Sequence, residues 1–297
     1  MTVFMFPGQG SQKKGMGGEL FSSVEQFKRL EAEIDNVLGY SLRQMCLEDP
    51  ENQLKDTRYA QPCLYVVNAL SYFDAVSRGA QPTIAIGHSV GEFNALMAAG
   101  AFDLLTGLRL VQKRGELMAR AKNGGMAAIV GLRPERIKAL LDEKGLSDLD
   151  IANYNSAQQT VVSGPLDVIL RAGPIFEGAG ASLYFPLRVS AAFHSRYMAQ
   201  AGRAFDEFLA GVKFSTLQIS VISNVTAQPY PTGDASSVIR SLLVKQISAP
   251  VLWAQTITSL LEQGVRDAKE VGPGQVLTKL FHEAAKDFVG TSSVVAG

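Results

Sequence analysis

The chain has 297 residues, of which 46% are hydrophobic and 19% are charged, and this balance excludes an intrinsically disordered protein. Its 28 basic and 28 acidic residues cancel to a formal net charge of zero, so we expect no general attraction to nucleic acid or to an anionic membrane. The sequence has no signal-peptide pattern at Met1 and no apolar run of the ~18 residues that span a bilayer, which predicts a cytoplasmic protein.

The first part of the chain alternates short apolar strands with helical patterns. Strands are predicted at Val3–Phe6 and Thr83–Ile86, and helices near Cys63–Val76, Val90–Ala99 and Leu104–Asn123. Such alternation is typical of a mostly parallel sheet covered by helices. The glycine pair that follows the last of these helices predicts a break in the chain.

A different pattern begins after this break. Strands and helices follow in the order β-α-β-β-α-β, which is the ferredoxin-like unit. The strands are expected at 126–132, 150–154, 159–163 and 182–187, and the two helices open at Pro134 and Pro165. Beyond this unit, strands at 218–223 and 269–271 alternate with helices near 235–246, 250–263 and after Gly274. The predicted fold class is therefore α/β, with a large α/β-hydrolase-like domain (1–124 and 190–297) interrupted by a small ferredoxin-like domain (125–189).

The most informative motif is Gly87-His88-Ser89-Val90-Gly91, which follows a predicted strand and opens a helix. This is the context of a nucleophile elbow, in which glycines permit a sharp turn that exposes the serine hydroxyl. The helix N-terminus beneath the turn favours developing negative charge. Ser89 is therefore the candidate nucleophile.

A catalytic serine needs a base, and the chain has three histidines. His88 lies inside the elbow with its side chain directed away from that of Ser89, and His282 lies among charged residues of the last helix. His194 follows the point where the inserted domain rejoins the large one, and clefts form at such junctions. His194 is the candidate base, although a histidine in such a loop can also serve only to hydrogen-bond its surroundings.

Two further segments have both a functional and a structural interpretation. The loop Phe6–Gln12, with sequence Phe-Pro-Gly-Gln-Gly-Ser-Gln, lacks the spacing of a phosphate-binding loop but could present backbone N–H groups to an oxyanion. It could equally be a tight turn after the first strand. Arg114 lies on the helix after the elbow helix, where a guanidinium facing the cleft would bind a carboxylate. Periodicity does not decide which arginine faces the cleft.

Taken together, these motifs resemble the malonyl-CoA:carrier-protein transacylases of fatty acid synthesis and the acyltransferases of polyketide synthases. The resemblance covers about nine-tenths of the chain and rests on six ordered motifs. These are residues 6–12, Gln61-Pro62, Gly87-His88-Ser89-Val90-Gly91-Glu92, Gln112-Lys113-Arg114-Gly115, Phe193-His194-Ser195 and Val271-Gly272-Pro273-Gly274. The family's fold, a large α/β domain with a ferredoxin-like insert, is also the one that the pattern predicts.

The resemblance assigns a role to each matching residue. It makes Ser89 the acyl-bearing nucleophile, His194 the general base and then acid, and Arg114 the partner of the malonyl carboxylate. It implies an oxyanion hole built from the backbone N–H groups of Gln9 and Val90, and a backbone carbonyl of Gln246 that orients the histidine. Gln61, Asn155 and Phe193 are implied as supporting residues. No bound cofactor and no metal are implied, because coenzyme A enters only as the carrier of the substrate.

The implied partners are malonyl-CoA and an acyl carrier protein. Phe193 and Val90 resemble the malonyl-selective polyketide acyltransferases more than the methylmalonyl-selective ones. Residues 192–195 and Asn94 are closer to polyketide acyltransferases than to the fatty-acid enzyme, which predicts a discrete enzyme that loads polyketide synthase carriers in trans. The alternatives are a malonyl transacylase of fatty acid synthesis and an acyl hydrolase that clears stalled carriers. Arg114 argues against the hydrolase. The balanced charge and self-contained fold predict a monomer.

Overall fold

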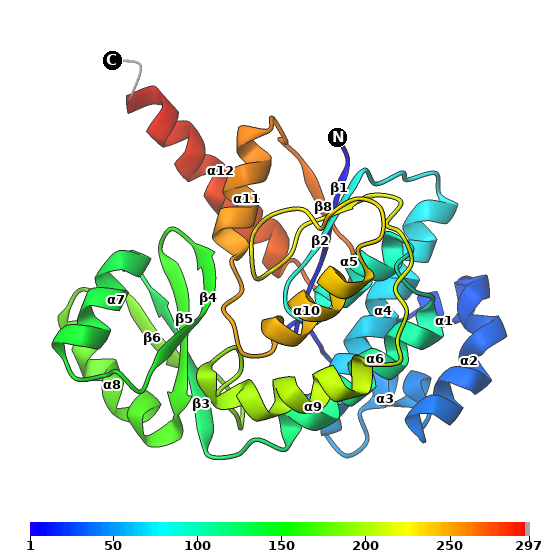
Figure 1. The fold of residues 1–297 in the computed structure, drawn as a ribbon, viewed down its shortest axis with the longest axis horizontal. Coiled ribbons are helices and arrows are strands. Elements are labelled where there is room, and N and C mark those ends of the chain that lie inside the picture. Colours follow the sequence, from blue (N-terminus) through cyan, green and yellow to red (C-terminus); the bar gives the residue numbers. More distant parts are fainter. Residues whose placement is uncertain (295–297) are drawn as a thin grey trace.

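The computed structural model describes residues 1–294, which form two sheets with their own helices (Figure 1). The larger part is built on a parallel sheet in the order β7-β2-β1-β8. Its strands are β1 (Val3–Phe6), β2 (Ile84–Gly87), β7 (Ser220–Val221) and β8 (Ala268–Glu270). The predicted strand at 218–223 is therefore only two residues long.

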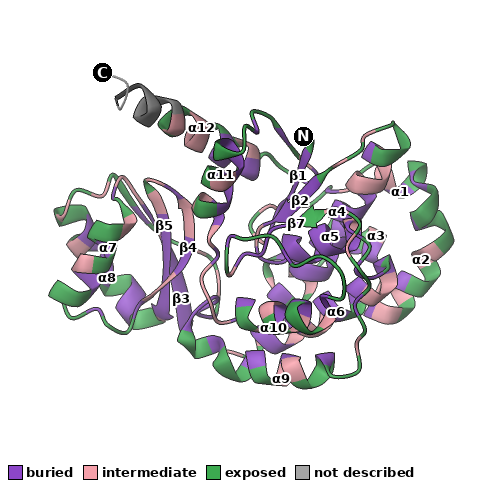
Figure 2. Ribbon diagram, turned by 45° about the horizontal axis from the view of Figure 1, so that its top comes forward, coloured by how far each residue is buried: buried purple, intermediate pink, exposed green. Residues whose placement is uncertain are grey.

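Side chains alternate across the strands of this sheet, so each of its faces carries a separate apolar core. Phe4 and Phe6 pack among the helices on one face, while Val3 and Met5 pack against Trp253 and its neighbours on the other. Both faces of β1 and β2 are buried, as Figure 2 shows, which explains why these strands are continuous apolar runs in the sequence.

The helices of the larger part surround this sheet. They are α1 (Leu20–Ser23), α2 (Glu25–Leu38), α3 (Leu42–Glu48), α4 (Thr57–Ser77), α5 (Gly91–Ala98), α6 (Leu104–Ala119), α9 (Ala199–Leu209), α10 (Ser236–Gln246), α11 (Trp253–Glu262) and α12 (Val276–Val294), with short 3₁₀ turns η1 (Gln53–Lys55) and η2 (Arg196–Met198). The predicted helices are present, but α4 begins at Thr57 and includes Pro62, whereas the sequence pattern predicts this helix only from Cys63.

The second sheet is antiparallel and has the order β4-β5-β3-β6. Its strands are β3 (Gly124–Val130), β4 (Asp150–Ser156), β5 (Gln159–Pro165) and β6 (Leu183–Pro186), and α7 (Pro134–Glu143) and α8 (Leu166–Gly178) pack on it around a core of their own. The chain order of these elements is the predicted β-α-β-β-α-β order. We propose domain limits of 1–124 and 190–297 for the large domain and 125–189 for the small one.

Gly124 and Gly125 differ from the prediction, because they begin β3 instead of breaking the chain. The break lies in the four residues before them. A Cβ atom on Gly124 would lie 2.3 Å from the backbone nitrogen of Ala192, so glycine is needed where the outgoing chain crosses the returning one. These two crossing segments form the junction between the sheets.

The small domain is also attached to the large one through β4. The Tyr154 N–H donates to the Val251 carbonyl at 3.0 Å, and the Val251 N–H donates to the Ala152 carbonyl at 2.9 Å. The edge of the antiparallel sheet thus continues onto the segment before α11, and this fixes the position of the small domain beside the elbow.

Candidate active site

Ser89 occupies a sharp turn between β2 and α5, with a left-handed φ of 52°. A Cβ atom on either flanking glycine would collide with backbone. On Gly87 it would lie 2.0 Å from the Gly91 carbonyl group, and on Gly91 it would lie 2.1 Å from the Phe6 carbonyl oxygen. The two glycines are therefore required by space, and the strained serine is held by the packing around it. This arrangement is a nucleophile elbow.

His194 lies beside Ser89, and the distance from its Nε2 to Ser89 Oγ is 2.8 Å. Its Nδ1 lies 2.8 Å from the backbone carbonyl oxygen of Gln246. Because a carbonyl can only accept, Nδ1 carries the proton and Nε2 is left to accept from the serine. Burial, reinforced by the charge of Arg114, lowers the pKa of His194 to about 3, so the ring is neutral at physiological pH.

Arg114 on α6 is fully buried next to the same hydroxyl. Its Nη2 donates to Ser89 Oγ at 3.1 Å and to Gln246 Oε1 at 2.8 Å, and its Nη1 donates to Gln61 Oε1 at 2.7 Å. Its Nε has no hydrogen-bond partner among the described residues. Burial lowers the pKa of Arg114 to about 9 against the opposing charge of Glu92, so the guanidinium remains charged at pH 7. A buried cation that lacks an anionic hydrogen-bond partner is suited to bind an anion.

Two backbone N–H groups near Ser89 are free to stabilise an oxyanion. Gln9 follows β1 and lines the same cavity as Ser89, and Val90 is the N-cap residue of α5. Within the part of the chain that the structure describes, neither backbone N–H has an acceptor. The side chain of Gln9 is held by a 3.0 Å hydrogen bond to Thr57 Oγ1.

The remaining predicted residues contact the site in different ways. Phe193 is buried and lines the cavity next to His194. Asn155 on β4 is hydrogen-bonded to His88, whose Nε2 lies 3.0 Å from Asn155 Oδ1, and among the described residues it has no hydrogen bond to Ser89 or His194. Asn155 thus contacts the elbow through His88.

A cavity of about 660 Å³ opens onto Ser89 and His194 and lies between the two domains. Its lining includes Met126 and Asn153 of the small domain. It also includes four exposed cations, which are Lys13, Lys14, Lys55 and Arg188. The cavity therefore contains the candidate base, and in its outer part four cations outnumber one acid, Asp49.

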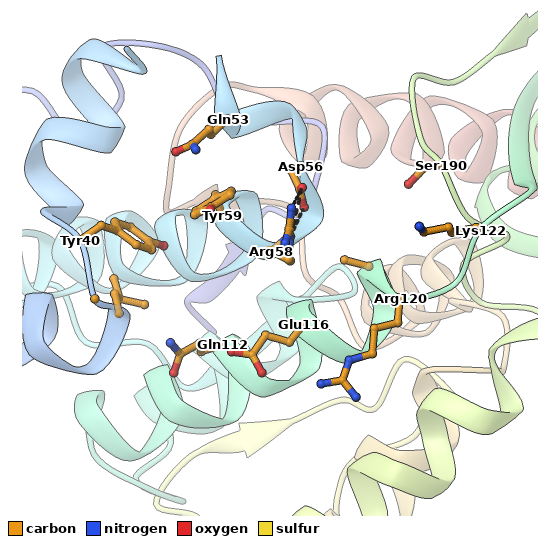
Figure 3. Close-up of a pocket in the computed structure, with 13 residues that line it drawn as sticks. Tyr40, Gln53, Asp56, Arg58, Tyr59, Gln112, Glu116, Arg120, Lys122 and Ser190 are labelled. Carbon is orange, nitrogen blue, oxygen red and sulfur yellow. Dashed lines mark hydrogen bonds and ion pairs between the residues drawn. The ribbon is translucent and has the colours of Figure 1, made fainter. Parts of the chain in front are cut away.

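A second cavity, of about 960 Å³, is larger but is lined by neither Ser89 nor His194 (Figure 3). Its lining mixes cations with acids, and the guanidinium of Arg58 is already paired with Asp56 at 2.7 Å. Ser190 is its residue nearest in sequence to His194. The smaller cavity is therefore the candidate active site.

The sequence matches the family model described as an acyl transferase domain over residues 3–297. The chain belongs to the acyl transferase domain family. It is 48% identical over 284 residues to a polyketide biosynthesis malonyl CoA-acyl carrier protein transacylase of Bacillus velezensis, which covers 95% of this chain and 96% of that one. It is 36% identical over 283 residues to the malonyl CoA-acyl carrier protein transacylase of Escherichia coli, covering 94% and 91%.

Solved structures agree with this family assignment. The crystal structure of a malonyl CoA-acyl carrier protein transacylase from Burkholderia pseudomallei matches with a TM-score of 0.91 and 46% identity, covering 96% of this chain and 98% of that one. A malonyl-transacylase solved in complex with a type II polyketide synthase acyl-carrier protein matches with a TM-score of 0.89 and 34% identity, covering 96% and 93%. The predicted two-domain α/β fold is confirmed.

This acyltransferase also contains site residues that sequence reasoning missed. Asn224 accepts from the Ser89 N–H at 2.7 Å through Oδ1 and donates to the Gly87 carbonyl at 2.6 Å through Nδ2. Glu92 is buried under the elbow and accepts from the Tyr230 hydroxyl at 2.7 Å. Glu92 is part of the elbow motif, but no local signal links Asn224 or Tyr230 to it.

Two further observations concern other kinds of site in this acyltransferase. Across residues 1–294, no cluster of three or more His, Cys, Asp or Glu side chains is arranged to hold a metal ion. None of the helices in the same range is both long and apolar enough to span a bilayer.

Proposed function

We propose that this acyltransferase moves a malonyl group from malonyl-CoA to the phosphopantetheine thiol of an acyl carrier protein. The observation that carries the proposal is the position of Ser89 Oγ, 2.8 Å from His194 Nε2 and 3.1 Å from Arg114 Nη2. One hydroxyl thus contacts both a neutral base and a buried cation. The names of the relatives, which include malonyl transacylases, support the same reaction.

In the first half-reaction, Ser89 Oγ attacks the thioester carbonyl while His194 Nε2 takes its proton. Negative charge then develops on the carbonyl oxygen, and the N–H groups of Gln9 and Val90 would donate hydrogen bonds to that oxygen. Each such donor typically lowers the barrier by ~3 kcal/mol. The C–S bond breaks, His194 returns the proton to the departing sulfur, and Ser89 carries the acyl group as an ester.

Arg114 gives the reaction its preference for malonyl. In malonyl the free carboxylate is only one methylene away from the carbonyl that Ser89 attacks, so it falls within reach of a guanidinium that already touches Ser89 Oγ. Acetyl has no carboxylate and would leave the buried cation uncompensated. The planar fork of arginine suits a bidentate carboxylate.

The second half-reaction reverses the first with a different thiol. The carrier's phosphopantetheine thiol gives its proton to His194 and attacks the ester, and His194 returns this proton to Ser89 Oγ as the ester C–O bond breaks. Coenzyme A and phosphopantetheine both carry phosphate groups, and the exposed cations Lys13, Lys14, Lys55 and Arg188 of the cavity are placed to receive them. No step in this sequence requires a cofactor or a metal.

We further propose that the carrier belongs to a polyketide synthase. Identity is 48% to the Bacillus velezensis polyketide relative and 36% to the Escherichia coli transacylase, and this difference supports the polyketide role. The malonyl transacylase of fatty acid synthesis remains the second candidate. We expect the protein to act in the cytoplasm as a monomer.

The proposal is tested with radiolabelled malonyl-CoA and acetyl-CoA, with and without phosphopantetheinylated carriers of polyketide and fatty acid synthesis. The wild type should retain malonyl label and pass it to a carrier, fastest to the polyketide carrier, and Ser89→Ala should not become labelled. Release of free malonate with no transfer to either carrier would make the protein an acyl hydrolase and refute the transferase function.

A further inference from the structure

Glu92 is a buried carboxylate, and no basic side chain among the described residues forms an ion pair or a hydrogen bond with it. It is 1% exposed and lies in the first turn of α5, directly beneath Ser89. Its Oε1 accepts from the Tyr230 hydroxyl at 2.7 Å and from the Asn224 backbone N–H at 3.1 Å, and its Oε2 accepts from Gln246 Nε2. Removing a carboxylate from water costs free energy, so we expect Glu92 to have a function that offsets this cost.

The Gln246 side chain connects this carboxylate to Arg114. Its Nε2 has two hydrogens, and they go to the Ser89 carbonyl at 3.0 Å and to Glu92 Oε2. Its Oε1 must then face the opposite way, where it accepts from Arg114 Nη2 at 2.8 Å. With the amide reversed, its N–H groups would face the guanidinium and Arg114 Nη2 would lose this acceptor. Glu92 therefore determines which end of the amide meets Arg114.

Arg114 is thus held between two amide oxygens. Gln61 Oε1 accepts from Nη1 on one side and Gln246 Oε1 accepts from Nη2 on the other, so the plane of the fork is defined by two contacts. Phe93 lies under the guanidinium, with the Cζ atom 5.7 Å from the ring centroid. Loss of the Gln246 contact would leave the fork held only by Gln61 and by the Ser89 hydroxyl, which becomes an ester oxygen in the acyl-enzyme.

The negative charge of Glu92, like its hydrogen bonds, supports the ability of Arg114 to bind a carboxylate. Burial lowers the pKa of Arg114, and the negative charge of Glu92 opposes this shift. Burial raises the pKa of Glu92 itself to about 7, so Glu92 helps to keep the guanidinium protonated in the share of molecules in which it is ionised. Orientation and charge of the carboxylate-binding group both depend on a residue that lies beyond the reach of the substrate.

We propose that Glu92 is a positioning residue that acts through Gln246 on Arg114 and so sets the enzyme's preference for acyl chains that end in a carboxylate. This inference rests on the proposed function, because it assumes that Arg114 binds such a carboxylate. A change that weakens the hydrogen bonds of Glu92 should therefore reduce activity with malonyl-CoA. Activity with acetyl-CoA, which has no free carboxylate on its acyl group, should stay almost the same.

The variant that tests this is Glu92→Gln, which keeps the shape but places an NH₂ group against donors. We expect kcat/KM for malonyl-CoA to fall about tenfold, the effect of one weakened buried hydrogen bond to a charged group, and kcat/KM for acetyl-CoA to change less than twofold. Tyr230→Phe removes one donor but keeps the charge, and should reduce the malonyl to acetyl ratio in the same direction by less. If Glu92→Gln does not fold, Tyr230→Phe decides.

A matched control is Glu116→Gln, which removes an equal charge from a half-exposed position on the helix of Arg114. It should leave the ratio unchanged. In an Arg114→Ala background, Glu92→Gln should have no further effect on either substrate, because the group through which it acts is gone.

Three outcomes would overturn the inference. The first is an unchanged malonyl to acetyl ratio in both Glu92→Gln and Tyr230→Phe. The second is an equal loss of malonyl and acetyl activity, which would mean that Glu92 supports the elbow instead. The third is an effect of Glu92→Gln that is just as large in the Arg114→Ala background. Failure of the proposed function looks different, since the wild type would then show no malonyl preference or Arg114→Ala would leave that preference intact.

Discussion

Replacing Arg114 with alanine tests the origin of the malonyl preference. The guanidinium is buried, and its Nη2 contacts the hydroxyl that would carry the acyl group. Two of its N–H groups would form charge-assisted hydrogen bonds to the substrate carboxylate, each contributing about 1.5–3 kcal/mol. Their combined loss is about 3–6 kcal/mol, which corresponds to a fall of roughly 150- to 25,000-fold in kcat/KM for malonyl-CoA.

Acetyl-CoA gains nothing from these contacts, so its kcat/KM should change far less. The assay measures both substrates with the same phosphopantetheinylated carrier and compares the malonyl to acetyl ratio. Arg109→Ala is the matched control, because Arg109 is exposed on the same helix, and it should leave the ratio unaltered. Arg114→Lys keeps the charge without the fork and should recover only part of the preference. A ratio that survives Arg114→Ala would refute the assignment of this residue to the carboxylate.

Three further predictions concern the elbow, the base and the cavity. Gly87→Ala should destabilise the protein by at least about 3 kcal/mol in thermal unfolding, because its Cβ would lie 2.0 Å from Gly91, whereas Gly178→Ala meets nothing within 4 Å and should not. Acyl-enzyme formation, followed in rapid-quench experiments, should keep its rate well below pH 6.5, since the pKa of His194 is lowered to about 3; a sharp loss at pH 6.5 would contradict this. Charge reversal to glutamate at Lys13, Lys14 and Lys55 should raise KM for malonyl-CoA and for the carrier at low ionic strength, and the increase should be smaller at high salt. The transfer of malonyl from a short, phosphate-free thioester should not change.

Much of the fold could be predicted from sequence because its signals are local. Val3–Phe6 is a continuous apolar run because both faces of the parallel sheet are buried, and the ferredoxin-like order is visible in alternating strands and proline-opened helices. Errors occurred where a distant segment decides the structure. The sequence pattern predicts that Gly124 breaks the preceding helix, yet this position is glycine because the returning chain at Ala192 passes close to it.

The candidate site also contains some residues with local sequence signals and others that depend on distant contacts. Ser89 could be identified because the elbow needs glycines at fixed spacing, and His194 because it follows the domain junction. Which arginine enters the cleft depends on how α6 packs against α4, and no periodicity within α6 reports this. Gln246 was assigned only a backbone role, although its side chain joins Arg114 to Glu92. Hydrogen bonds between residues more than 130 positions apart have no signature in a single sequence.

The positions of Arg114 and His194 connect substrate choice to the chemical step. After burial, the charge of Arg114 is the largest cause of the lowered pKa of His194, so the empty enzyme holds a weak base. A malonyl carboxylate bound to Arg114 would cancel much of that charge and raise the pKa of His194, which makes it a stronger acceptor for the Ser89 proton. Acetyl brings no such anion. A substrate with a carboxylate would therefore be favoured twice, once in binding and once in the proton transfer that follows.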